Sequence, residues 1–408
     1  MAPVSRKKKS KRSAAAGPAS LDLYSAKRTF SATPEPAPAA TAPKAGPLLF
    51  VVQQHAAQRL HFDFRLECDG VLKSWAVPKG LSLNTSDKRL AVPTEDHPYD
   101  YGSFEGVIPP KQYGSGEVIV WDCGVYSPDE GNETWFHDRA EAEKRVREGI
   151  EKGKLSFLLR GEKIKGSFAL VRTSDRKNWL LIKHRDRHVS TEDVTEQSRS
   201  VLSGVAVDEM KVVPARRIPA TQLGPAGPIE KMPADLAPMH AEAGDAPFND
   251  PNWMWEPKLD GYRVLAFIGE HGVKLRSRRG LELAHSFPRL VAELQKQAVN
   301  GMILDGEIVA FDAAGRPSFS ALQNRVQLKT EREIAAADQQ SPVVFFCFDL
   351  LHFAGVNLRK HPYRDRRRYL SQCLLPSPLV QLVHAADDGK ELHAAALASG
   401  FEGVIGKR

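Results

Sequence analysis

One lysine, Lys258, stands in the octapeptide Glu256-Pro-Lys-Leu-Asp-Gly-Tyr-Arg263, among charged residues that could make it a nucleophile toward a nucleotide phosphate. A lysine near pH 7 is an ammonium ion without a free lone pair, but neighbouring cations and a bound metal can lower its pKa enough for attack. Gly261 would let the backbone approach a nucleotide closely. Ordinary charged turns contain the same residue types, so this segment alone leaves both interpretations open.

Four downstream segments favour the nucleotide interpretation, because all carry polar or aromatic residues suited to a nucleotide site. Taken singly, they could be a salt-bridged turn, a turn carboxylate, a core strand and a hairpin tip. Their occurrence together and in this order after Lys258 is improbable by chance. The segments are Ser277-Arg-Arg-Gly280, Leu304-Asp-Gly-Glu-Ile-Val309, Phe345-Phe-Cys-Phe-Asp-Leu-Leu351 and Glu402-Gly-Val-Ile-Gly-Lys407.

With these motifs, residues 232–408 resemble the adenylation (nucleotidyltransferase) domain of ATP-dependent DNA ligases, through motifs I, Ia, III, IIIa and IV. The resemblance implies that Lys258 attacks the α-phosphorus of ATP and becomes lysyl-AMP. Charge developing on the phosphate needs cations and a metal, and an aromatic face suits a purine. It also implies that Arg263, Arg278 and Glu307 hold the ribose and its polar network, that Phe348 stacks on adenine, that Glu402 helps bind Mg²⁺ or Mn²⁺, and that Lys407 contacts the phosphate.

Relative to that family, the sequence departs at its end. The family continues past motif IV to a strand with a Lys-x-Lys motif and then to an OB-fold domain, whereas this sequence ends at Arg408. We therefore expect an adenylation domain that is incomplete at its C-terminus. We also expect self-adenylation by these 408 residues to be severely impaired.

A second group with chemical potential lies earlier in the chain. Residues 60–66 alternate with period two, so apolar positions 60, 62, 64 and 66 should face one side and His61, Asp63 and Arg65 the other. With His55 in the preceding turn, two imidazoles and a carboxylate could hold Mn²⁺ and leave positions open for water and substrate. A lone His-x-Asp pair is more often a polar surface pair. Further polar residues in the same region move the balance toward a phosphate-processing centre: Lys79, Arg89, His97 and Tyr101.

The glycine-containing segment Tyr113-Gly-Ser-Gly-Glu117 could be mistaken for a phosphate-binding loop. It precedes an expected strand, not a helix, so no helix N-terminus is available to bind a phosphate. We predict an ordinary turn there.

Residues from about 21 to 187 resemble the 3′-phosphoesterase domain of bacterial DNA ligase D. The resemblance is carried by Val51-Val-Gln-Gln-His55, Arg59-Leu-His-Phe-Asp-Phe-Arg-Leu66, Lys73-Ser-Trp-Ala-Val-Pro-Lys-Gly80, Glu95-Asp-His97 and Tyr113-Gly-Ser-Gly116. It implies a β-barrel that removes 3′-terminal ribonucleotides and 3′-phosphates to leave a 3′-OH. The implied roles are Mn²⁺ binding by His55, His61 and Asp63, phosphate binding by Arg65, Lys79, Arg89 and His97, and support from Tyr101, with His61, His97, Arg65 and Tyr101 counted as catalytic.

An N-terminal arm belongs to the same resemblance. Lys27-Arg28-Thr29-Phe30 and Glu35 match the segment that contributes to the ribonucleotide-trimming step. The family often has an acid after that arginine, where this sequence has Thr29. The difference puts the arm's contribution in question.

The expected elements divide the chain into a multidomain protein. Short strands at 49–53, 60–66, 71–77, 90–92, 117–121 and 179–183, with one helix at 140–153, indicate an all-β barrel or sandwich. Strands at 262–268, 273–276, 302–311 and 343–350, with helices at 288–298 and 364–373, indicate an α+β domain without βαβ alternation. We predict a disordered basic tail over 1–20, a phosphoesterase domain over 21–195, a Pro/Ala-rich linker over 196–231 and the adenylation domain over 232–408.

Composition fits a DNA-processing enzyme of the cytoplasm. The 408 residues carry a formal net charge of +7, which suits a polyanionic partner. No stretch is apolar enough for a membrane span, and the four cysteines form no CxxC pair, so a reducing compartment fits. We expect double-stranded DNA ends and nicks, with 3′-phosphate or 3′-ribonucleotide termini, as substrates, bacterial Ku as a partner, and association with the nucleoid.

Two other functions remain open from the sequence. An RNA ligase or capping-type enzyme shares the lysine motif, although the fused phosphoesterase argues against it. A catalytically incomplete scaffold that binds DNA ends would show DNA binding without metal-dependent 3′-end processing.

Overall fold

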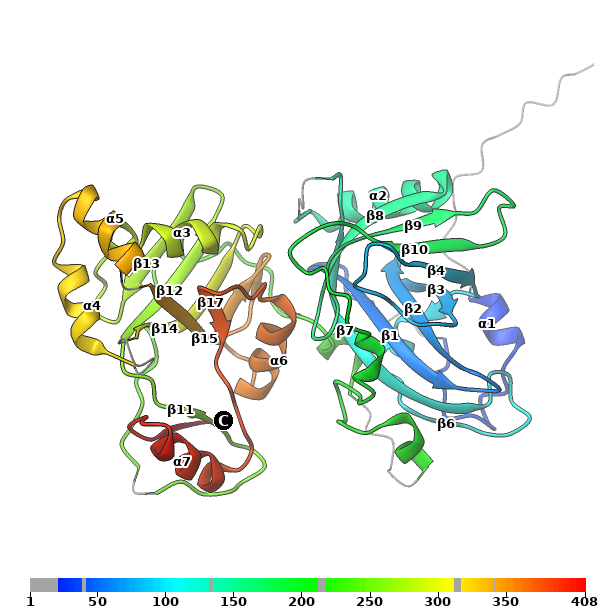
Figure 1. Ribbon diagram of the computed structural model, residues 1–408. Helices are drawn as coiled ribbons and strands as arrows, with labels where there is room; N and C mark the ends of the chain where they lie inside the picture. Colours follow the sequence, from blue (N-terminus) through cyan, green and yellow to red (C-terminus); the bar gives the residue numbers. More distant parts are fainter. Residues whose placement is uncertain are drawn as a thin grey trace, which may run out of the picture.

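The computed structural model describes residues 21–38, 42–131, 135–211, 218–244, 246–311, 317–340 and 342–408. The predicted basic tail of residues 1–20 lies outside this range. The described chain forms two domains side by side, an N-terminal β domain and a C-terminal α+β domain (Figure 1). Within the described residues, none of the helices has the length and apolar character needed to cross a membrane.

The N-terminal domain is a closed, eight-stranded antiparallel barrel. The strand order runs β1-β2-β3-β4-β10-β9-β8-β7, and pairing of β7 with β1 closes the ring. Two short strands extend it: β5 pairs with β3, and β6 with β7. The bounds are β1 Leu48–Ala56, β2 Leu60–Cys68, β3 Val71–Val77, β4 Lys88–Pro93, β5 His97–Pro98, β6 Gly106–Ile108, β7 Gly116–Pro128, β8 Lys154–Gly161, β9 Lys165–Arg172 and β10 Trp179–Lys183.

The predicted alternation along β2 is confirmed. Phe62, Phe64 and Leu66 belong to an apolar cluster with members from all eight barrel strands, so this face of β2 points into the barrel. His61, Asp63 and Arg65 therefore share the outer face. The prediction was wrong for Leu60, which is exposed at the start of β2 and does not join the core.

Several segments cover this outer face of β1, β2 and β3. Helix α1 (Asp22–Ala26), the 3-10 turn η1 (Tyr99–Ser103) and β6 supply the apolar cover, with Tyr24, Tyr101 and Phe104 in one buried cluster. The predicted linker also contributes: its described residues Ala220 and Leu223 pack beside β1 and β7. The polar residues on this face thus lie beneath a second layer and not in open solvent.

The single helix predicted in this domain is α2 (Arg139–Lys152). The Asp138 side chain accepts from the backbone N–H of Glu141 at its N-terminus, and Gly153 in the left-handed region (φ +82°) ends it. Strands β8 and β9 complete the ring between β7 and β10 and were not predicted from the sequence.

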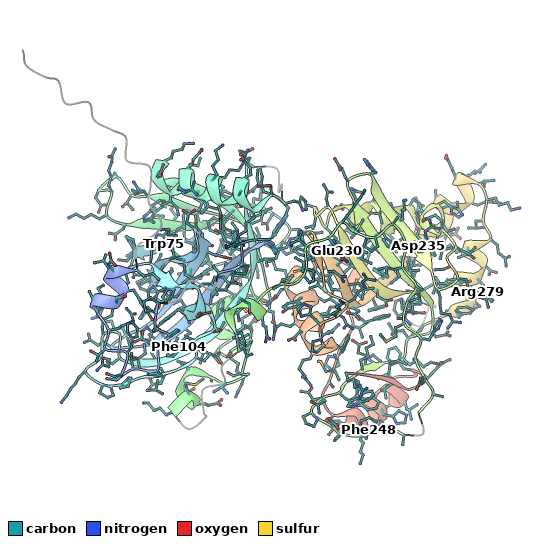
Figure 2. The ribbon with its side chains drawn as sticks, turned by 180° about the vertical axis from the view of Figure 1, so that it is seen from behind. Trp75, Phe104, Glu230, Asp235, Phe248 and Arg279 are labelled. Carbon is teal, nitrogen blue, oxygen red and sulfur yellow. The ribbon has the colours of Figure 1, made fainter. Side chains whose placement is uncertain are left out.

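The C-terminal domain has a larger and a smaller lobe. The larger lobe is a mixed sheet, β13-β12-β14-β15-β16, with β17 parallel to β15, and helices α3 to α6 pack around it. The smaller lobe pairs β11 with β18 beside helix α7. Figure 2 labels Asp235 and Arg279 in the larger lobe and Phe248 in the smaller one.

Every strand predicted in this domain is present, whereas α4, α5, α7, β11, β16, β17 and β18 were not predicted. The strands are β11 Met254–Pro257, β12 Tyr262–Gly269, β13 Gly272–Ser277, β14 Met302–Ala310, β15 Val343–Phe353, β16 Val356–Asn357, β17 Val380–Leu382 and β18 Val404–Lys407. The helices are α3 Pro288–Gln295, α4 Phe319–Val326, α5 Glu331–Gln340, α6 Tyr363–Cys373 and α7 Gly389–Ala398.

The two domains meet at the C-terminal end of helix α6. Arg160 of β8 is 2% exposed and donates to the backbone carbonyls of Cys373, at 2.7 Å, and Gln297. Lys165 of β9 donates to the carbonyls of Ser371 and Gln372, both at 2.7 Å. These donors satisfy carbonyls that a helix end leaves unpaired.

Candidate functional site

The three predicted metal ligands of the barrel come together on its outer face. His55 lies opposite His61 in the pairing of β1 with β2, and Asp63 follows on the same face of β2. One ligand atom from each of the three residues lies within 4.8 Å of the others. Among the described residues this is the one cluster of three or more histidine, cysteine or acidic side chains close enough to hold a metal ion.

Backbone carbonyls fix the orientation of both imidazoles. Nε2 of His55 lies 2.8 Å from the carbonyl oxygen of Gly114, and Nδ1 of His61 lies 3.0 Å from that of Arg59. Since a carbonyl can only accept, each of these nitrogens carries the proton. The other nitrogen of each ring faces Asp63, at 3.8 Å for His55 Nδ1 and 3.6 Å for His61 Nε2. Such outer hydrogen bonds are what orients metal-binding histidines.

Arg65 organises the polar groups beside this triad. Its guanidinium donates to Asp63 at 2.8 Å, to the Gln53 side chain at 2.7 Å and to the Ser74 hydroxyl at 2.9 Å. Although burial acts to raise the pKa of Asp63, the charge of Arg65 and the two histidines hold it well below its usual range. Asp63 is therefore an ionised carboxylate, the form that binds a cation.

His97 and Tyr101 border Arg65 on the side away from the triad. Nδ1 of His97 lies 2.9 Å from Nη1 of Arg65 and 2.8 Å from the carbonyl of Glu95. Burial, with the charges of Arg65 and Arg28, lowers the pKa of His97 well below its usual value. The ring is thus neutral. Burial likewise keeps Tyr101 protonated by raising its pKa.

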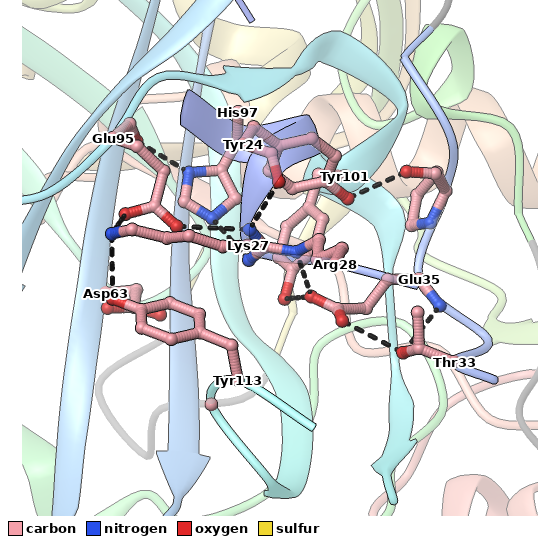
Figure 3. Close-up of polar contacts among 12 residues, drawn as sticks. Tyr24, Lys27, Arg28, Thr33, Glu35, Asp63, Glu95, His97, Tyr101 and Tyr113 are labelled. Carbon is pink, nitrogen blue, oxygen red and sulfur yellow. Dashed lines mark hydrogen bonds and ion pairs between the residues drawn. The ribbon is translucent and has the colours of Figure 1, made fainter. Parts of the chain in front are cut away.

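The N-terminal arm closes over this cluster, as Figure 3 shows. Arg28 donates to Glu35 at 2.8 Å and to Glu95 at 3.1 Å, and its guanidinium lies 3.9 Å from the Tyr24 ring centre. Glu35 also accepts from the hydroxyl of Tyr101 at 3.1 Å. Arg28 and Glu35 thus dock the arm on the barrel, because both side chains are almost fully buried in a salt bridge.

Lys79 and Arg89 lie at the barrel rim and not in the cluster. Phe62 pairs with Val77, and Ala76 pairs with Val92, so Lys79 and Arg89 lie at the end of the barrel where β2 begins, near His61. Lys79 is exposed, and Arg89 pairs with Asp87 at 2.9 Å. Their phosphate-binding role stays a prediction.

In the second domain, Lys258 lies between the two lobes, directly after β11. Its side chain pairs with the carboxylate of Glu402, and its backbone N–H donates to the carbonyl of Gly403 at 2.8 Å. Both paired side chains are about half exposed. The predicted nucleophile and the predicted metal-binding acid are therefore neighbours, although 144 positions separate them in the sequence.

Lys407 and Phe348 form the adjoining wall. Nζ of Lys407 lies 3.9 Å from the Phe348 ring centre and donates to Glu256 at 2.6 Å. Glu256 is 2% exposed and also accepts from the hydroxyl of Tyr363. The Phe348 ring, Lys407 and the buried carboxylate of Glu256 thus lie together, and Glu256 stands two positions before Lys258 in the chain.

Arg263 and Glu307 are strand partners, and Arg278 directly follows Ser277, which pairs with Val264. Arg263 pairs with Asp305 through two hydrogen bonds of 3.1 and 2.8 Å, and its strand partner is Glu307. Burial raises the pKa of Glu307 to about 8. Arg278 is exposed in the turn after β13, and its predicted role at the ribose stays a prediction.

Sequence reasoning missed several residues of both sites. Gln53 carried a signal, because it stands two residues before His55 on β1 and so shares its face. Glu95 and Asp305 were quoted only as neighbours of other residues. The carbonyl of Gly114 left no signal, since any residue supplies a carbonyl and only the fold brings this one to His55.

Two family models match the chain. Residues 53–172 match the DNA Ligase D 3′-phosphoesterase domain, and residues 238–408 match the ATP dependent DNA ligase domain. The first match contains the triad, and the second contains Lys258 and its neighbours.

Curated relatives match over both domains. A "Multifunctional non-homologous end joining protein LigD" from Pseudomonas aeruginosa is 39% identical over 407 residues, which cover 95% of this chain and 45% of that protein. A "Multifunctional non-homologous end joining DNA repair protein LigD" from Mycobacterium tuberculosis is 36% identical over 389 residues, covering 95% and 43%. The chain thus spans less than half the length of these relatives.

Proposed function

The chain belongs to the DNA ligase D family, and we propose that its barrel is a metal-dependent phosphoesterase that cleans the 3′ ends of DNA. The substrates would be a 3′-terminal ribonucleotide and a 3′-phosphate, and the product a 3′-OH. The observation that carries the proposal is the triad of His55, His61 and Asp63, with both imidazoles turned toward an ionised carboxylate.

The donor set fits a divalent cation. Two imidazole nitrogens and one carboxylate leave further positions for water and a phosphate oxygen, and Mn²⁺ accepts such mixed ligands. When bound, the cation would polarise the phosphate and lower the pKa of a bound water molecule. The preference for Mn²⁺ in the barrel, and for Mg²⁺ or Mn²⁺ beside Lys258, is part of the proposal.

The chain's own residues supply the positive charge that a phosphate needs. The Arg65 guanidinium is fixed by Gln53 and Ser74, so a phosphate would meet a preorganised donor. His97 is neutral and buried beside Arg65, so it would border a bound phosphate without a competing charge change. Tyr101 supports this layer by packing against His97, with ring centres 4.7 Å apart.

A primer-template with a 3′-phosphate or a 3′-ribonucleotide tests the proposal. The full chain with Mn²⁺ should convert both ends to a 3′-OH, and His61→Ala should abolish the conversion while circular dichroism shows an intact fold. If the wild type leaves both ends untouched yet binds the duplex, the chain is a scaffold that binds DNA ends and the proposal fails.

We further propose that the second domain binds ATP and that Lys258 is the site of AMP attachment. Nζ would attack the α-phosphorus, forming a phosphoramidate as the bond to pyrophosphate breaks, with the ammonium proton lost first. The pairing of Lys258 with Glu402 and the Phe348–Lys407 wall support this assignment. Radiolabelled ATP with Mg²⁺ tests it: label on the wild type that survives in Lys258→Arg would contradict the assignment.

The remaining expectations belong to the same proposal. Sealing of nicked DNA rather than nicked RNA, joining of double-strand breaks with bacterial Ku, and a cytoplasmic, nucleoid-associated location follow from the family. All four cysteines are free and buried, which suits a reducing compartment. The boundaries 21–195, 196–231 and 232–408 are our proposed domain limits.

A further inference from the structure

The loop that joins β6 to β7 does more than turn the chain. It contains Tyr113-Gly-Ser-Gly116, for which the sequence indicated an ordinary turn. Gly114 adopts the left-handed region (φ +72°), and its carbonyl accepts a hydrogen bond from the N–H of His55 Nε2 at 2.8 Å. The position of this loop is therefore tied to a proposed metal ligand.

Tight packing holds the far end of the loop as well. Gly116 has φ +144°, and a Cβ there would overlap the carbonyl oxygen of Ala56. Because Gly114 is hydrogen-bonded to His55 and Gly116 packs against Ala56, the backbone position of Tyr113 beside the triad is constrained.

The Tyr113 ring is secured from one side and open on the other. Nζ of Lys27 lies 4.4 Å from the ring centre and 3.1 Å from the hydroxyl, and it also pairs with Glu95 at 2.9 Å. Tyr113 is nevertheless 48% exposed, whereas the aromatic side chains of Tyr24 and Tyr101 in the same cluster are buried. A fixed, half-exposed aromatic ring next to a phosphate-processing centre has the features of a stacking platform for a nucleoside.

We propose that Tyr113 stacks on the terminal nucleoside, the group on the far side of the scissile phosphate, and so favours the removal of a 3′-ribonucleotide. This inference rests on the proposed phosphoesterase function. In that step, water adds to phosphorus and the bond from phosphorus to the 5′-oxygen of the terminal nucleoside breaks. The nucleoside leaves with the proton from water, and the 3′-phosphate that remains is hydrolysed in a second step to the 3′-OH. A 3′-phosphate end has no nucleoside beyond the phosphorus, so its hydrolysis gains nothing from the ring.

Lys27 would act as a positioning residue for the ring. Its ammonium group bridges the Tyr113 hydroxyl to Glu95, and Glu95 also pairs with Arg28 of the arm. The arm and the loop thus close on each other through one lysine. This link gives the arm of this chain a contact to the site that does not depend on an acid at Thr29.

The test compares two substrates in the same full-length proteins. Steady-state kcat and KM are measured for removal of a 3′-ribonucleoside and of a 3′-phosphate from matched primer-templates with Mn²⁺. Base–aromatic stacking predicts that Tyr113→Ala lowers kcat/KM for the ribonucleoside end, relative to the phosphate end, by roughly 5- to 150-fold, mainly through KM. Tyr113→Phe keeps the ring and its contact with Lys27 but loses the hydroxyl, so it should retain most of the wild-type ratio.

Three comparisons make the outcome decisive. Leu23→Ala removes an exposed side chain from α1 of the same arm and should leave the ratio unchanged. A Tyr113→Ala ratio equal to that of the wild type overturns the inference, as does a Tyr113→Phe defect as large as that of Tyr113→Ala. If the wild type processes neither end, the proposed function itself has failed.

Discussion

The interface between the two domains gives a quantitative prediction at Arg160. This side chain leaves the barrel at β8, is 2% exposed, and donates to the carbonyls of Cys373 and Gln297 in the second domain. Its guanidinium also lies 4.9 Å from the Trp135 ring centre. Substitution with methionine keeps the length and the apolar contacts of the side chain but removes the charge and both donors.

The expected loss follows from these contacts. A hydrogen bond to a charged group contributes about 1.5–3 kcal/mol, and two carbonyls would lose such a donor in a buried place. Relief from the desolvation of the buried guanidinium offsets part of that loss. We therefore expect Arg160→Met to lower the free energy of unfolding by about 2–4 kcal/mol.

Urea unfolding followed by tryptophan fluorescence measures this difference, and small-angle scattering reports whether the domains stay docked. Arg187→Met is the matched control, because Arg187 also crosses between the domains, to Glu293 at 3.1 Å, but at the surface. An exposed ion pair of this kind is worth about 0–1 kcal/mol. If Arg160→Met costs no more than Arg187→Met and the radius of gyration is unchanged, Arg160 does not hold the domains together.

Three further predictions concern single residues of the two sites. Arg65→Lys should lower 3′-phosphate hydrolysis by roughly 100-fold or more in a gel assay, because a lysine cannot hold Gln53 and Asp63 while presenting a fixed fork; near-wild-type turnover would contradict this. Gly116→Ala should cost about 1–3 kcal/mol in urea unfolding, from positive φ and overlap with a carbonyl, and a neutral effect would show that the loop adapts. Burial raises the pKa of Glu307 in the folded state to about 8, so between pH 4.5 and about 8 the folded state binds a proton that the unfolded state has lost. The free energy of unfolding should therefore fall as pH rises through this range. Glu307→Gln should make the free energy of unfolding less dependent on pH, and an equal slope in both proteins would refute the raised pKa.

The sequence pattern was sufficient to predict features that depend on residues close together in the chain. The period-two alternation along β2 placed His61, Asp63 and Arg65 on one face, because successive side chains of a strand point to opposite sides. The four strands β12 to β15 of the second domain were also predicted from apolar runs between turn residues. These features depend on residues a few positions apart.

Contacts between distant segments could not be obtained in this way. The carbonyl of Gly114 reaches His55 across 59 positions, and Lys258 reaches Glu402 across 144. Strand β8 was missed because its residues serve two environments: Leu155 and Phe157 face the barrel core, whereas Arg160 enters the other domain. Sequence periodicity carries no information about which surface a strand's end will meet.

The most direct test of the central claim is a Mn²⁺ titration in which metal binding and 3′-phosphate hydrolysis are followed on the same sample. Electron paramagnetic resonance would report bound Mn²⁺ while inorganic phosphate release reports turnover. We predict that the wild type, freed of metal by chelation and kept without ATP, gains activity in parallel with one Mn²⁺ bound at the triad. Asp63→Ala should lose this Mn²⁺ and the activity, while Lys258→Ala keeps both. Undiminished Mn²⁺ binding and phosphate release by Asp63→Ala would contradict the account.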